Sequence, residues 1–194
     1  MVEREKKILL TSGEYYYLIL LGQYCLKTEE QVNYYYDTED YSFDKKGITC
    51  RIRQKNGQHH ATIKRHSLKD PNVSIEKKCL VNDAFDITFF RDLGVKYHGN
   101  LTTKRSTVVP CYGVTVCLDK NTYLNKIDYE LEVEYKEDAE KVAEMVIKEI
   151  AKRLVLVAAT KCEEEFMDRI NAGPNKSQRF FEGKMLIDNE KDDA

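Results

Sequence analysis

The stretch that organises the chain is its first strand candidate, Val2-Glu3-Arg4-Glu5-Lys6-Lys7-Ile8-Leu9-Leu10. Side chains of a strand point alternately to its two faces, so Glu3, Glu5 and Lys7 would share one face. Buried charges are costly unless they are paired or hold a metal. This face therefore suits a wet, charged cavity in which the two carboxylates bind a hard cation. Taken alone, the segment fits an exposed edge strand or a charged first helical turn better.

A later stretch, Ile127-Asp-Tyr-Glu-Leu-Glu-Val-Glu-Tyr135, repeats the pattern and changes that balance. In a strand, Asp128, Glu130, Glu132 and Glu134 fall on one face, and the apolar side chains fall on the other. Two acidic faces from distant parts of the chain favour a shared, charged site over two unrelated solvated strands.

A basic hairpin lies between the two acidic strands. Asn56-Gly57 is the strongest short hairpin signal, and the strands on its two sides carry Arg51, Arg53 and Lys64 on their polar face. Ser12 is the predicted cap of the first helix. Periodicity predicts strands at 31–38, 71–81, 101–109 and 112–119, and helices at 12–25, 83–93, 137–154 and 159–169.

The composition fits one globular domain of 194 residues. Charged residues make up 33% and hydrophobic residues 42%, and the formal net charge is −2. That balance gives no general attraction for nucleic acid or anionic lipid, and no apolar run approaches the ~20 residues that span a bilayer. The 6 scattered cysteines lack a C-x-x-C pair, which predicts free thiols rather than zinc sites or disulfides. Without an apolar export signal, the expected location is cytoplasmic.

Many short antiparallel strands with one apolar and one charged face predict a closed or strongly curved sheet. The apolar faces would pack outward against helices, and the charged faces would line a hydrated interior. Carboxylates hold Mg²⁺ or Mn²⁺, whereas arginine and lysine match phosphate oxygens. The expected occupant is therefore a polyanion bound together with divalent metal. The sequence has no Gly-x-x-x-x-Gly-Lys-Ser/Thr motif, which excludes a P-loop mechanism.

At this point the motifs carry a family resemblance. Glu3-x-Glu5-x-Lys7 resembles the signature of the CYTH family, one of the triphosphate tunnel metalloenzymes, and the chain is most similar to the bacterial YjbK-type members. Each further motif is weak alone, but the ordered set is specific. The set is Tyr35-Tyr36-Asp37-Thr38, Arg51-Ile52-Arg53, Thr62-Ile63-Lys64, Arg105, Leu118-Asp119, Tyr123-Leu124-Asn125-Lys126, Tyr129-Glu130-Leu131-Glu132 and Thr160-Lys161.

The resemblance implies an α+β fold, with an eight-stranded antiparallel closed β-barrel that binds triphosphate inside and helices packed outside. It implies that Mg²⁺ or Mn²⁺ is held by four carboxylates, which act in catalysis together with Lys7; these are Glu3, Glu5, Glu130 and Glu132. The implied triphosphate-binding residues are Lys7, Arg51, Arg53, Lys64, Arg105 and Lys161. Asp119 is expected to orient a neighbouring base. Weaker candidates are Glu134, Glu76 and Lys78, and the last two depend on strand register.

The C-terminal part departs from the family pattern. Relatives carry an Arg-Phe pair soon after Thr160-Lys161, where this chain has Glu165-Phe166, and Arg169 is a candidate substitute. Residues 1–172 are predicted to form the tunnel domain. Residues 173–194 are predicted to form a polar, flexible tail, with a piece around Phe180 that could dock on the domain or on a partner.

The leading hypothesis is a metal-dependent triphosphatase, an acid anhydride hydrolase acting on tripolyphosphate or on a nucleoside or thiamine triphosphate. Its partner is a small-molecule triphosphate, with no nucleic acid and no membrane; the sequence leaves a homodimer open. The alternative enzyme is a class IV-type adenylate cyclase, which needs an adenine and ribose pocket that the sequence does not reveal. A non-catalytic polyphosphate-binding module would need the basic residues without the carboxylates.

Overall fold

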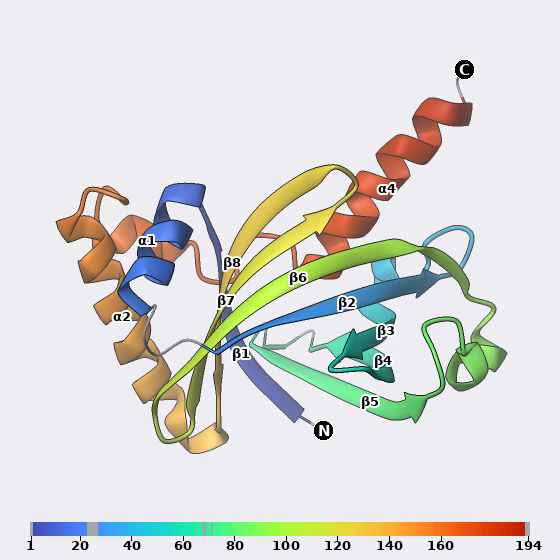
Figure 1. Ribbon diagram of the computed structural model, residues 1–194, viewed down its shortest axis with the longest axis horizontal. Helices are drawn as coiled ribbons and strands as arrows, with labels where there is room; N and C mark the ends of the chain where they lie inside the picture. The colour runs from blue at the N-terminus through green and yellow to red at the C-terminus, as the bar shows by residue number, and fades with distance from the viewer. Residues whose placement is uncertain (1, 23–26, 68, 71, 193–194) are drawn as a thin grey trace.

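The computed structural model describes residues 2–22, 27–67, 69–70 and 72–192 (Figure 1). Within this part of the chain, antiparallel strands form a closed barrel in the order β1-β5-β4-β3-β2-β6-β7-β8. The strands are β1 (Val2–Leu10), β2 (Lys27–Asp37), β3 (Ile48–Lys55), β4 (Gln58–His66), β5 (Val73–Val81), β6 (Lys96–Cys111), β7 (Val114–Tyr123) and β8 (Lys126–Tyr135). The prediction of a closed antiparallel barrel is confirmed.

The helices lie outside the barrel in two groups (Figure 1). Helices α1 (Ser12–Gly22), α2 (Glu140–Leu156) and α3 (Glu163–Asp168) lie together on one side, and α4 (Lys176–Asp192) projects from the other. Short 3-10 helices are η1 (Asp44–Lys46), η2 (Ile87–Leu93) and η3 (Glu137–Ala139). None of the described helices combines the length and apolar character needed to cross a bilayer.

The main hydrophobic core lies between the outer barrel surface and helices α1 and α2. Ile8 of β1 and Leu131 and Val133 of β8 point outward and pack in one cluster with Ala143 and Ile147 of α2. These side chains are at most 1% exposed. Because strand side chains alternate, packing this face outward turns the charged face of the same strands inward. The inverted arrangement expected from the sequence is confirmed.

Turn chemistry fixes the register of the basic hairpin. Asn56 and Gly57 have φ angles of 50° and 75°, the left-handed conformation that a tight hairpin between twisted strands requires. The resulting register pairs Arg51 with Thr62 and Arg53 with His60. The predicted hairpin is therefore confirmed.

Two local predictions differ from the structure. Thr11, not Ser12, caps α1, because its hydroxyl accepts from the amide of Glu14, whose carboxylate accepts from the Thr11 amide. This reciprocal pair is a capping box. The helix predicted at 83–93 is the 3-10 helix η2, which starts later because the side chain of Asp86 caps it. The predicted end of the first helix, at Cys25, lies outside the described residues.

Helix α4 occupies the segment predicted as a flexible tail. Phe180 and Phe181 are 0% exposed and cluster with the barrel residues Tyr35, Leu101 and Tyr123. The approach is close: a Cβ atom added to Gly99 of β6 would lie 2.9 Å from the Phe180 ring. This buried aromatic pair anchors a helix whose remaining sequence is largely polar.

Candidate active site

Barrel closure brings the first and the last strand together, and with them the two acidic faces. The β1–β8 register pairs Glu5 with Glu134 and Lys7 with Glu132. Glu132 and Glu5 are 5% and 8% exposed. The acidic faces of β1 and β8 therefore form one continuous wall inside the tunnel.

Two carboxylate clusters on this wall could hold metal ions. In each cluster, one oxygen per residue lies within 4.8 Å of the others, and Glu132 belongs to both. The clusters are Glu5, Glu132 and Glu134, and Asp119, Glu130 and Glu132. Carboxylate oxygens are the ligands that Mg²⁺ and Mn²⁺ prefer. Asp119 was expected only to orient a base, but here its oxygens lie among the candidate ligands.

Lysines neutralise the β1 carboxylates. Lys64 Nζ lies 2.7 Å from Glu5 and 2.9 Å from Glu3, and Lys7 Nζ lies 3.0 Å from Glu5. Burial raises the pKa of Glu5, but Lys7 and Lys64 outweigh it and bring the pKa to about 2. Glu3 pairs with Lys64 and belongs to neither cluster.

Arg105 of β6 fixes the second cluster. Its guanidinium donates to both oxygens of Asp119, at 2.8 and 2.6 Å, and also to Glu132 and Glu134. Burial lowers the pKa of Arg105, but Glu132 and Asp119 outweigh it, so the pKa lies above its usual range. A fork-shaped, fully charged donor of this kind orients carboxylates rigidly.

The opposite wall, formed by β2 and β3, is cationic. Arg53 Nε donates to the Asn33 side-chain oxygen at 2.9 Å, and Arg51 Nη2 lies 3.4 Å from Glu76. Burial and then the neighbouring charges of Arg51 and Arg105 lower the pKa of Arg53 to about 10. A guanidinium repelled by its neighbours favours an anionic ligand.

Of the weaker predicted residues, Glu76 faces the tunnel and Lys78 does not reach its interior. Glu76 is 6% exposed and lies 4.0 Å from Lys64 Nζ. The register pairs Lys78 with Thr62, so its strand register is as predicted, but its side chain is exposed.

The structure corrects the prediction for Lys161. This residue is exposed in the loop between α2 and α3, and α2 packs on the outside of the barrel. Arg169 does not substitute for a phosphate ligand either. Its guanidinium binds both carboxylate oxygens of Glu14, at 2.7 and 2.9 Å, together with the carbonyl oxygen of Leu9.

Two cations of α4 enter the site in their place. Lys176 Nζ lies 2.6 Å from Asp119, 3.2 Å from Glu132 and 3.3 Å from Glu130. Arg179 donates to Glu130 at 2.8 Å. These carboxylates raise the pKa of both cations against the effect of burial.

Sequence reasoning missed these two residues, although a signal was present. Lys176 and Arg179 are three positions apart and share a helix face, directly before the Phe180-Phe181 pair. Arg179-Phe180 is an Arg-Phe pair, further from Thr160 than the resemblance implies.

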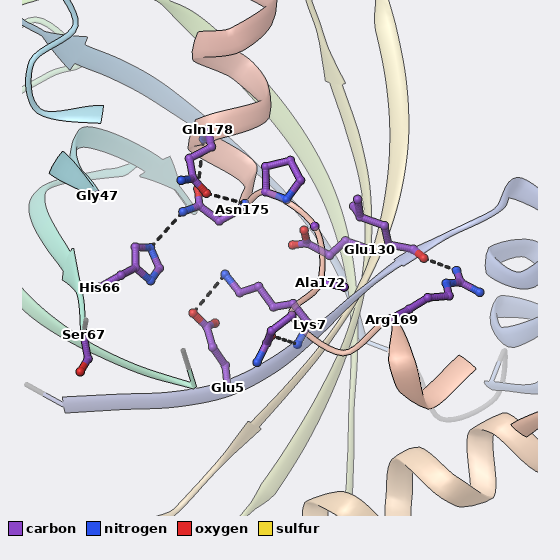
Figure 2. Close-up of a pocket in the computed structure, with 14 residues that line it drawn as sticks. Glu5, Lys7, Gly47, His66, Ser67, Glu130, Arg169, Ala172, Asn175 and Gln178 are labelled. Atoms are coloured by element: carbon purple, nitrogen blue, oxygen red, sulfur yellow. Dashed lines mark hydrogen bonds and ion pairs between the residues drawn. The ribbon is translucent and has the colours of Figure 1, made fainter. Parts of the chain in front are cut away.

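A pocket of about 420 Å³ opens beside the tunnel, next to the linker that precedes α4 (Figure 2). Figure 2 shows Glu5 and Lys7 pointing toward each other and His66 pointing toward Asn175, whose amide donates to the ring at 3.2 Å. Burial, followed by the charge of Lys64, lowers the pKa of His66 to about 4. The neutral ring thus accepts a hydrogen bond that holds the linker.

Comparison with known proteins gives one family and one fold. Residues 1–164 match the model of the CYTH domain family. The chain is 30% identical over 150 residues to the protein named putative triphosphatase YjbK of Bacillus subtilis (strain 168). The aligned region covers 69% of this chain and 77% of that protein.

Solved structures show the same fold. A crystal structure from Bacillus halodurans, described as a putative adenylate cyclase, has a TM-score of 0.67 and 24% identity, covering 92% of this chain and 97% of that one. A Hippeastrum protein, described as a putative adenylyl cyclase with a dominant triphosphatase activity, has a TM-score of 0.56 and 18% identity. That match covers 76% of this chain and 87% of the other.

Proposed function

The chain belongs to the CYTH domain family, and we propose that it is a metal-dependent triphosphatase. The proposed reaction is hydrolysis of a phosphoanhydride bond in tripolyphosphate or in a nucleoside or thiamine triphosphate. One observation best supports this proposal: an acidic wall with Glu132 and a cationic wall with Arg53 face each other across one tunnel. Phosphoryl transfer depends mainly on positioning and charge neutralisation, which these walls supply together.

The residues of the acidic wall fit a divalent cation. The donor set is made of carboxylate oxygens, and the ammonium of Lys176 lies among three of them, so this position stabilises a cation. We assign the metal, Mg²⁺ or Mn²⁺, to the predicted ligands Glu5, Glu130 and Glu132, with Asp119 and Glu134 added from the clusters. The fourth predicted ligand, Glu3, pairs with Lys64 outside both clusters, and it could join the ion only after leaving that lysine. Such an ion neutralises charge on phosphoryl oxygens and activates water at neutral pH.

The protein residues bind and orient the substrate. Arg51 and Arg53 of the cationic wall and Lys64 of β4 would bind phosphoryl oxygens, and Arg105 would stabilise charge as it develops. Carboxylates of the acidic wall would orient the attacking water in line with the bond that breaks. Burial lowers the pKa of Lys7, but Glu5 and Glu132 outweigh it and raise the pKa above the usual range, which favours a cationic Lys7 beside these carboxylates.

We include Lys176 and Arg179 among the substrate-binding candidates in place of Lys161. Both belong to α4, whose aromatic anchor is buried against the barrel, so we also propose that residues 173–192 are part of the tunnel domain. The residual cavity between the walls is about 50 Å³ with these side chains in place. Entry of a triphosphate therefore requires the α4 cations to rearrange.

One assay separates the candidate functions. Purified protein is incubated with Mg²⁺ or Mn²⁺ and with tripolyphosphate, ATP or thiamine triphosphate, and the products are resolved by chromatography. Release of orthophosphate is the expected result. Cyclic AMP with pyrophosphate from ATP would instead identify an adenylate cyclase, and tight binding without turnover would identify a polyphosphate-binding module.

A further inference from the structure

An apolar groove lies on the outside of the barrel, between α1 and α2, which sit on the same side of the sheet (Figure 1). Its floor includes the outward-facing side chains of Leu118 on β7 and Leu131 on β8, which are at most 4% exposed. Its volume is about 680 Å³, and small-molecule pockets have volumes of about 300–1,000 Å³. Apolar surface left open on this scale marks a candidate binding site.

The N-terminal half of α2 gives the groove an apolar end. Val142 and Val146 are four positions apart and lie on one flank of the helix, and Met145 follows the rim, where it is 69% exposed. The β6–β7 hairpin, whose turn lies against the N-cap of α2, adds Val108 and Val116 to the lining. This end of the groove therefore offers contacts to a hydrocarbon group.

The C-terminal half of α2 gives the groove a cationic end. Lys148, Lys152 and Arg153 line it, and Glu149 is the one acidic residue in the described lining. Glu149 already pairs with Arg153 at 3.1 Å, so the lining offers no counter-charge to the two lysines. The helix dipole favours cations in the last turn, but Lys148 lies about two turns before the end of α2. The lysines therefore favour an anion at this end.

The two ends together select a class of ligand. An apolar end and a cationic end in one groove complement a single hydrocarbon chain with an anionic head. An amphipathic helix of a partner protein carries charge along its whole length, whereas the cations here are confined to one end. A bilayer surface would meet the outer rim, whereas the floor at Leu118 and Leu131 lies beneath the two helices.

We propose that the groove between α1 and α2 binds a free long-chain fatty acid. The hydrocarbon chain lies along Val142 and Val146, and the carboxylate lies at Lys148 and Lys152. The groove is on the opposite face of the sheet from the tunnel, so this inference does not depend on the proposed function.

The first test compares probes in titration calorimetry, below the concentrations at which they form micelles. Dodecanoate should bind at least about tenfold more tightly than dodecyltrimethylammonium, which has the same chain and a cationic head. Decanoate should bind about fifteenfold more weakly than dodecanoate, since each buried methylene contributes a factor of about four. Absence of dodecanoate binding, or equal binding of the two head groups, would overturn the inference.

The second test locates the carboxylate. The double substitution Lys148→Glu and Lys152→Glu reverses the charge at the cationic end, and both side chains are exposed, so the fold should be kept. It should weaken dodecanoate binding about tenfold. Lys141→Glu is the matched control, because Lys141 is exposed on the same helix but does not line the groove. Binding by the double variant within twofold of the unchanged protein would contradict the assignment.

The remaining measurements test other occupants of the groove. Sedimentation of the ligand-free protein should show no dimer that Met145→Glu dissociates, since such a dimer would mean that a second copy covers the groove. Flotation with phosphatidylglycerol vesicles should show no binding that occurs without binding of monomeric dodecanoate, since that result would identify a membrane surface as the partner. Either result would overturn the inference.

Discussion

The ammonium of Lys176 and a divalent metal ion should compete for the same carboxylates. Lys176 Nζ lies within 3.3 Å of Asp119, Glu130 and Glu132, which also form one of the two candidate metal clusters. The substitution Lys176→Met keeps much of the aliphatic chain and removes the charge. It leaves the aromatic anchor of α4 unchanged, so its effect should be confined to the cluster.

The expected loss of stability without metal can be estimated. Removing one partner of a buried ion pair costs about 3–5 kcal/mol, since it leaves uncompensated buried charge. Arg105 still binds Asp119 and Arg179 still binds Glu130, so the lower end, about 3 kcal/mol, applies here. For a chain of this length that loss corresponds to a melting temperature lower by about 6–12 °C.

Metal should reverse this loss. An ion that binds only the folded state stabilises it by about 2.7 kcal/mol at 100 times its dissociation constant. In the unchanged protein the ion must first displace the Lys176 ammonium from the carboxylates, which offsets part of that stabilisation. The increase in melting temperature on adding Mn²⁺ or Mg²⁺ should therefore be larger for Lys176→Met than for the unchanged protein.

The assay is thermal unfolding in EDTA and across a series of metal concentrations. Lys184→Met is the matched control, because Lys184 lies on the same helix and pairs with Asp188 outside the carboxylate clusters. It should show the same metal response as the unchanged protein. An equal metal-induced increase in all three proteins would refute the idea that Lys176 and the metal share a site.

Three further predictions concern individual side chains. Glu130→Gln should abolish turnover while circular dichroism stays unchanged, and retained activity would remove this residue from the metal site. Arg53→Ala should weaken substrate binding by about 1.5–3 kcal/mol, seen as a higher KM, because the variant lacks a charged donor for the phosphoryl oxygens. His66 binds its proton at a pKa of about 4 when folded and 6.5 when unfolded, so the unfolded state holds more protons between these values and stability falls as pH drops through this window. In urea unfolding, His66→Gln should therefore lose less stability between pH 7 and pH 5 than the unchanged protein.

The alternation of charged and apolar residues was sufficient to predict which way the strands face. Leu131 and Val133 can be buried only on the side opposite Glu132, so their outward packing on α2 turns the carboxylates inward. This prediction needs only the sequence of the strand itself, because side chains alternate between its two faces with a period of two residues. The proximity of Glu5 and Glu134 cannot be predicted from the neighbouring sequence, because it depends on the pairing of the first strand with the last. The strand pattern indicated a closed or strongly curved sheet, and the family resemblance indicated a closed barrel of eight strands.

The cationic side of the site could be predicted only in part. Arg51 and Arg53 lie next to a hairpin whose turn fixes the register, so they were placed correctly. Lys161 was placed by sequence order alone, and the exit of α2 on the outside of the barrel leaves it exposed. Lys176 and Arg179 were assigned to a polar tail, because the apolar residues around Phe180 left open whether this segment docks on the domain or on a partner.

The tunnel explains why that polar segment forms a helix against the barrel. The ion-pair partners of Glu130 among the described residues are Lys176 and Arg179, and Arg179 also holds Asp128. Removing α4 would leave these carboxylates buried without counter-charge, which is unfavourable unless divalent ions take over. The α4 cations and the metal are thus alternative counter-charges for one acidic wall. The position of α4 is accordingly set by its own Lys176, Arg179 and two phenylalanines together with the charge of strands far away in the sequence.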